Sequence, residues 1–128
     1  MGDVTPVVFG LLCVAGGLGA AARFVIDGFV RERTSGALPW GTIAINLSGS
    51  FLLGLLTGLV AARALPAEWQ LVAGTGFLGG YTTFSTASLE TVRLLQERRW
   101  AAGLLTGLGV VVGATAAAGL GWWIGALV

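Results

Sequence analysis

Charged residues divide the chain into four long apolar stretches. These uncharged stretches run over residues 4–22, 34–62, 69–89 and 100–128. A helix needs about 20 mostly apolar residues to cross a bilayer, and each stretch reaches or nearly reaches that length. The short alternating strands of a membrane barrel are absent, and open sheets cannot span lipid. We therefore predict an all-α membrane protein with one domain and four transmembrane helices at 5–30, 39–62, 69–96 and 100–127.

The predicted helix ends carry the residues typical of a membrane boundary. Pro39 and Pro66 stand where the second and third helices begin, a position that tolerates proline. All five tryptophans lie near predicted helix ends: Trp40, Trp69, Trp100, Trp122 and Trp123. The first apolar run resembles a signal peptide but lacks a basic start, since its only early charge is Asp3. We expect it to be a retained helix.

The charge distribution predicts an orientation in the plasma (inner) membrane. Only 10% of the residues are charged, against about 25% in soluble domains. The first and third predicted loops hold Arg31, Arg33, Arg98 and Arg99, whereas the second holds Arg63 alone. The positive-inside rule then places the first and third loops in the cytoplasm and both termini outside. The net charge of +1 gives no reason to expect a nucleic-acid partner.

A stripe of polar and small residues follows one face of the second predicted helix. Its members lie four apart: Thr42, Asn46, Ser50, Gly54 and Gly58. A buried asparagine amide needs hydrogen-bond partners or water. Asn46 therefore predicts either a bond between helices or a wet pathway lined by an amide donor. Ladders of small residues, repeated at Gly103/Gly107 and Gly121/Gly125, allow close helix contacts within one chain or between chains.

The third predicted helix holds most of the candidate chemistry. Gly74, Gly76 and Gly79 match GxGxxG, but that motif needs a soluble strand–helix unit, so we reject a dinucleotide site. The pair Gly79–Gly80, followed by Thr82 and Thr83, predicts a helix broken near 79–83. The alternative is a continuous helix softened by glycine. Exposed carbonyls at a break suit a monovalent cation, and the new helix N-terminus suits an anion.

Few ionisable groups lie in the apolar stretches. Arg23 and Asp27, four apart, form either an ion pair at the interface or an anion-attracting pore mouth. Glu90 is within reach of Arg93. Cys13 has no partner for an internal disulfide, and we expect it to be buried. Without histidine, and with scattered acids, no nucleophile–base pair is present, so we do not expect an enzyme.

Three motifs resemble the CrcB/Fluc fluoride channels, in order and over nearly the whole chain. They are Gly16-Gly-Leu-Gly-Ala-Ala-Ala-Arg23, Gly41-Thr-Ile-Ala-Ile-Asn46-Leu-Ser-Gly49-Ser-Phe, and Gly76-Phe-Leu-Gly-Gly-Tyr-Thr-Thr-Phe-Ser-Thr86. The resemblance implies a passive fluoride channel that exports cytoplasmic fluoride and so lowers its toxicity. It also implies an antiparallel dimer of four-helix subunits with two narrow pores.

The resemblance also assigns site residues. Asn46 would be the pore asparagine, Phe84, Ser85 and Thr86 the pore-lining segment, and Arg23 the vestibule arginine. Glu90 would be the glutamate of the third helix. A central structural sodium ion would be held by the backbone carbonyls of Gly79 and Thr82. Fluoride, membrane lipid and a second, inverted chain are the expected partners.

Two departures from the family leave alternatives open. Ala87 stands where the family usually has a second phenylalanine, so a pore ring is missing. The arginine bias favours one orientation, so the inverted partner is either another copy with dual topology or an oppositely oriented paralogue. The alternative functions are a non-conducting or heterodimer partner subunit and a small four-helix coupled transporter. The transporter is disfavoured because such proteins use an acid early in the first helix, whereas Asp27 lies near its end.

Overall fold

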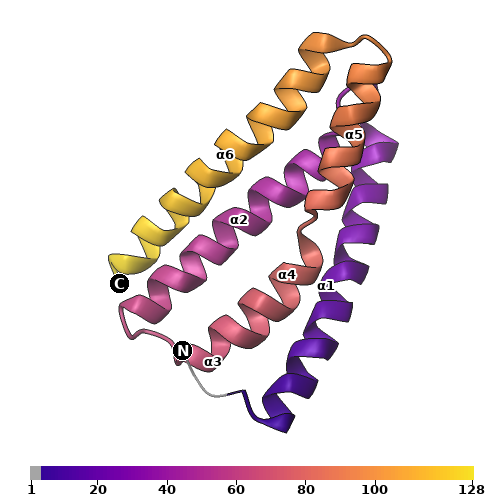
Figure 1. The fold of residues 1–128 in the computed structure, drawn as a ribbon. Coiled ribbons are helices and arrows are strands. Elements are labelled where there is room, and N and C mark those ends of the chain that lie inside the picture. Colours follow the sequence, from indigo (N-terminus) through magenta and orange to yellow (C-terminus); the bar gives the residue numbers. More distant parts are fainter. Residues whose placement is uncertain (1–3) are drawn as a thin grey trace.

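The computed structural model describes residues 4–128, which form helices joined by short loops (Figure 1). In chain order the elements are α1 (Pro6–Arg33), α2 (Trp40–Ala61), α3 (Ala67–Trp69), η1 (Gln70–Leu78), α4 (Gly79–Tyr81), α5 (Phe84–Gln96) and α6 (Trp100–Ala126). No strand occurs in this part of the chain. The predicted all-α fold is confirmed. The chain is a multi-pass membrane protein, and α1, α2 and α6 are each long and apolar enough to cross a bilayer.

Local sequence explains where α1 begins and ends. The hydroxyl of Thr5 accepts the N–H of Val8, 3.2 Å away, and so caps the helix. Pro6 follows at the first helical position, where no N–H is needed. Arg31 and Arg33 lie in the last turn, where positive charge offsets the negative end of the helix dipole. The helix extends to Arg33, beyond residue 30, the predicted end.

Glycine allows α2 and α6 to pack along each other. A Cβ on Gly54 or Gly58 would overlap backbone carbonyl oxygens of α6, and one on Gly121 or Gly125 would overlap those of α2. Such contacts bring helix backbones close enough for extensive van der Waals packing without a hydrophobic driving force. The small-residue ladders, whose use was left open by the sequence, therefore serve contacts within one chain at these four glycines.

The segment from Ala67 to Gln96 is helical but interrupted. Its first half passes through the π-helical turns of η1, and the chain is extended at Thr82 (φ −79°, ψ 159°) and Thr83 (φ −147°, ψ 118°). The predicted break is present, and the alternative of a continuous helix is wrong. Gly79 and Gly80 remain helical, so the break falls on the two threonines instead. That this segment spans the bilayer as the third transmembrane helix remains a prediction.

The two halves of this segment pack on different partners. Gln70–Tyr81 lies along α1, whereas α5 turns away to lie against α6 (Figure 1). The loops that follow α1 and α5 meet at the same end of the bundle, as the predicted topology requires. Cys13 is exposed on the surface of the single chain, so the prediction that it is buried was wrong.

Candidate functional site

The side chain of Asn46 on α2 binds the backbone at the helix break. The Asn46 carboxamide donates from Nδ2 to the carbonyl oxygen of Thr83 and accepts the N–H of Thr83 at Oδ1, both at 2.9 Å. Only this orientation of the amide satisfies both contacts, because the nitrogen can only donate and the carbonyl oxygen can only accept. Asn46 is 8% exposed. Of the two readings of Asn46, the bond between helices is therefore present.

Small residues let the break lie deep between its neighbours. A Cβ on Gly49 of α2 would overlap the Thr82 methyl group, and one on Gly19 of α1 would overlap the carbonyl oxygen of Phe77. Beside the break, Tyr81 is buried with Ile45 and Leu78, and its hydroxyl lies 3.0 Å from that of Ser48. The first two glycine-containing motifs thus provide the space into which the third motif folds.

The break exposes backbone groups of opposite polarity. α4 ends at Tyr81, and among residues 4–128 no hydrogen bond reaches the carbonyl oxygens of Gly79 and Thr82. On the other side, α5 begins at Phe84, and the Thr83 hydroxyl caps it by accepting the N–H of Thr86 at 3.2 Å. Unpaired carbonyls carry the negative end of a helix dipole, and unpaired N–H groups carry the positive end. The two ends therefore favour a cation and an anion respectively.

The positive side of the break opens on a cavity of about 250 Å³. It is lined by Ala20, Arg23, Phe24, Asp27, Thr42, Ile45, Thr83 and Thr86. Of the predicted fluoride-pathway residues, Arg23 and Thr86 meet here. Asn46 lies behind Thr83 and is not in the lining. Phe84 is 84% exposed and Ser85 is also exposed, so both face outward from the single chain.

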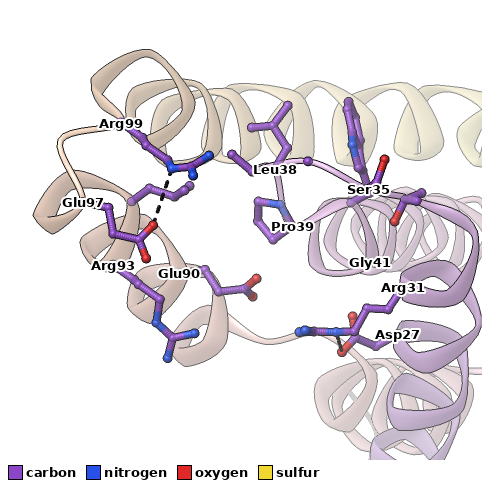
Figure 2. A pocket seen from close by; sticks show the side chains of 15 residues that line it. Asp27, Arg31, Ser35, Leu38, Pro39, Gly41, Glu90, Arg93, Glu97 and Arg99 are labelled. Carbon is purple, nitrogen blue, oxygen red and sulfur yellow. Dashed lines mark hydrogen bonds and ion pairs between the residues drawn. The ribbon is translucent and has the colours of Figure 1, made fainter.

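A larger cavity of about 480 Å³ lies toward the loops that follow α1 and α5 (Figure 2). Its charged lining residues are Asp27, Arg31, Glu90, Arg93, Glu97 and Arg99. Glu90 does not pair with Arg93 as expected from their spacing. Its carboxylate instead accepts a hydrogen bond of 2.6 Å from the hydroxyl of Thr42, which lines the smaller cavity. Asp27 lines both cavities.

Sequence reasoning missed three of these partners. Thr42 was seen only as a member of the polar stripe. Thr83 was seen only as part of the break, although a threonine at the residue before a helix is a recognisable N-cap. Asp27 pairs with Arg31, Nε to Oδ2 at 2.9 Å, rather than with Arg23. An acid placed four residues before a base pairs better on a helix than the reverse order, and this rule would have favoured Arg31.

Comparison with known proteins gives the family. The family described as CrcB-like protein, Camphor Resistance (CrcB), matches residues 10–122. A protein of Leifsonia xyli subsp. xyli named fluoride-specific ion channel FluC 1 is 56% identical over 124 residues, covering 97% of this chain and 90% of the relative.

Two further relatives carry the same description. Fluoride-specific ion channel FluC 2 of Mycobacterium tuberculosis (strain ATCC 25618 / H37Rv) is 47% identical over 109 residues, covering 85% of this chain and 83% of the relative. FluC 2 of Moorella thermoacetica is 45% identical over 104 residues, covering 81% and 84%. With a family match over most of its length and relatives of this similarity, the chain belongs to the CrcB family.

Proposed function

We propose that this chain is a passive, fluoride-selective channel that lets cytoplasmic fluoride leave the cell. The names of its relatives support a channel for fluoride, rather than an enzyme. The observation that carries the proposal is the N-terminus of α5, which opens beside Arg23 in the smaller cavity. A helix N-terminus and an arginine together attract an anion.

Fluoride is small and strongly hydrated, so a pore must replace its water with strong donors. The Asn46 amide carries two N–H groups, of which one is used on Thr83, so one donor remains. The hydroxyls of Ser85 and Thr86 add donors, and the ring edge of Phe84 is electropositive. We propose that these four residues form the fluoride pathway, with Arg23 at its entrance.

A structural sodium ion fits the carbonyl side of the break. Gly79 and Thr82 offer neutral oxygen atoms, which suit a hard monovalent cation. Within residues 4–128, no cluster of three or more His, Cys, Asp or Glu offers a divalent metal site. The Thr83 carbonyl already accepts a hydrogen bond from Asn46, whereas those of Gly79 and Thr82 accept none among residues 4–128. Bound there, sodium would supply positive charge near the anion path, where unscreened charge is expensive.

Two carbonyls from one chain are too few to enclose a cation, and Phe84 faces away from its own subunit. We therefore propose that the working unit is an antiparallel dimer, in which a second chain completes both the cation site and the pores. The inverted chain is either another copy or an oppositely oriented paralogue, because the arginines favour one orientation.

A partner subunit that does not itself conduct is the second candidate. Ala87 favours it, because this position provides no aromatic ring. A coupled transporter is disfavoured further by Asp27, whose carboxylate is held in an ion pair rather than free to exchange with a substrate.

Liposomes that contain the purified chain decide between these functions. We expect fluoride efflux, followed with a fluoride electrode, to need no proton gradient and to proceed with a proton shunt present. Efflux that requires a proton gradient would indicate the transporter, and no efflux from a folded dimer would indicate the partner subunit.

For the site, Asn46→Asp is expected to abolish efflux, since it replaces the amide donor with an oxygen facing the Thr83 carbonyl. Wild-type flux in this variant would remove Asn46 from the pathway. Size-exclusion chromatography establishes that the variant assembles like the wild type.

A further inference from the structure

Asp27 lies between the two cavities. Its side chain is on α1, one turn after Arg23 and one turn before Arg31, and it lines both the smaller and the larger cavity. An anion that passed from the larger cavity to Arg23 in the smaller one would move past this carboxylate, because Asp27 lines both. An acid at that point opposes anion entry unless its charge is cancelled.

The Asp27 carboxylate lies between Arg31 and the start of α2. Oδ2 accepts from Arg31 Nε at 2.9 Å. Oδ1 lies against the first turn of α2, where a Cβ on Gly41 would overlap it. The positive end of the α2 dipole stabilises an acid there. Figure 2 shows the Asp27–Arg31 pair at one wall of the larger cavity, beside Gly41.

This arrangement leaves Arg23 free. None of the ion pairs formed among residues 4–128 includes Arg23, although it is as close to Asp27 in sequence as Arg31 is. Arg23 instead lines the smaller cavity together with Thr83 and Thr86 at the start of α5. If Asp27 turned toward Arg23, the cavity would lose its one unpaired positive side chain.

The larger cavity is balanced in charge only while Arg31 is present. Three of its lining residues are acids (Asp27, Glu90, Glu97) and three are arginines (Arg31, Arg93, Arg99). Without Arg31 the lining carries one excess negative charge, and that charge lies on Asp27, the residue shared with the smaller cavity.

We propose that Arg31 is a positioning residue for anion entry. By holding Asp27 against α2, it cancels the acid between the cavities and keeps Arg23 available to the anion. This inference rests on the proposed fluoride pathway. Arg31 acts by neutralising and holding Asp27 rather than by attracting the anion directly, because its side chain is 62% exposed, where solvent screens its charge from the anion, whereas that of Asp27 is 26% exposed.

Fluoride efflux from liposomes tests the inference through its concentration dependence. We expect Arg31→Gln to raise the half-saturating fluoride concentration about tenfold at low ionic strength, with a smaller change in maximal rate. The shift should shrink at high salt as screening increases. Arg31→Lys, which retains the charge, should stay close to wild type.

The matched control is Arg33→Gln. Arg33 lies two residues further along α1, stacks on the Phe29 ring at 3.6 Å, and lines neither cavity. It removes the same charge from the same helix end without touching Asp27, so it should leave the half-saturating concentration unchanged. Equal shifts in Arg31→Gln and Arg33→Gln would overturn the inference, since charge alone would explain them.

The double variant Asp27→Asn/Arg31→Gln separates the two roles of Arg31. Removing the acid makes its partner dispensable, so the double variant should recover the wild-type half-saturation, and failure to recover would overturn the inference. If Arg31→Gln does not assemble, Asp27→Asn alone decides: a lowered half-saturating concentration supports the inference and a raised one refutes it. Absence of flux in the wild type would refute the proposed function itself and is distinguishable from all these results.

Discussion

Replacing Asn46 by alanine tests the two hydrogen bonds that link the helix break to α2. The substitution removes both 2.9 Å hydrogen bonds to the Thr83 backbone and leaves that N–H and C=O without partners. Asn46 and Thr83 are each 8% exposed, so water replaces the lost contacts poorly. We expect the variant to assemble less stably, with the loss located at the break.

The magnitude follows from the two orphaned groups. A buried donor or acceptor left unsatisfied costs about 1–3 kcal/mol, which gives about 2–6 kcal/mol for the pair. Hydrogen bonds between membrane helices average about 0.6 kcal/mol in double-mutant cycles, which sets a floor of about 1 kcal/mol for two. Thr83 also borders the smaller cavity, from which a water molecule can partly satisfy it. We therefore expect a loss of about 3 kcal/mol, roughly a hundredfold in the unfolding equilibrium constant.

Denaturation by SDS in mixed micelles measures this loss through tryptophan fluorescence. Protein concentration must be fixed, because the stability of an oligomer depends on it. Ser50→Ala is the matched control: Ser50 lies one turn along the same face of α2 and makes no side-chain hydrogen bond within residues 4–128. If Asn46→Ala lowers the free energy of unfolding by less than about 1 kcal/mol relative to Ser50→Ala, the loss is below the lower bound given above. The two hydrogen bonds would then not stabilise the break.

Three further substitutions in α6 test its packing against α2 and its buried hydroxyl. Gly121→Ala places a methyl group on the backbone carbonyl of Phe51, so we expect a loss of about 1–3 kcal/mol in the same denaturation assay. Gly119→Ala, which meets nothing within 4 Å, should be neutral, and equal effects would contradict the packing account. Thr106→Val removes the hydroxyl of a fully buried threonine that has no hydrogen-bond partner within the described chain, so stability should hold or rise. A clear loss of stability would contradict the expectation that this hydroxyl costs more to bury than it returns.

Much of the architecture follows from the sequence because its causes are local. Apolar stretches as long as the bilayer is thick have to be helical, since the backbone finds no other hydrogen-bond partners in lipid. Gly79 and Gly80 followed by two threonines weaken a helix at that point. These signals predicted the all-α fold and the approximate place of the break. The π-helical turns of η1 carry no comparable local pattern.

What the tertiary structure decided is which polar groups meet. Asn46 and Thr83 lie 37 residues apart, and Thr42 and Glu90 lie 48 apart, so no helical periodicity relates them. The sequence identified Asn46 as a residue too costly to bury without a partner, and Arg23 as a candidate to attract anions. Their partners depend on how closely the helices approach, which glycines such as Gly49 permit.

Asp27 can reach an arginine on either side of it along α1. In the structure it pairs with Arg31 and packs beside Gly41. Burial cost is a property of the residue itself, whereas its relief depends on the neighbours that the fold supplies.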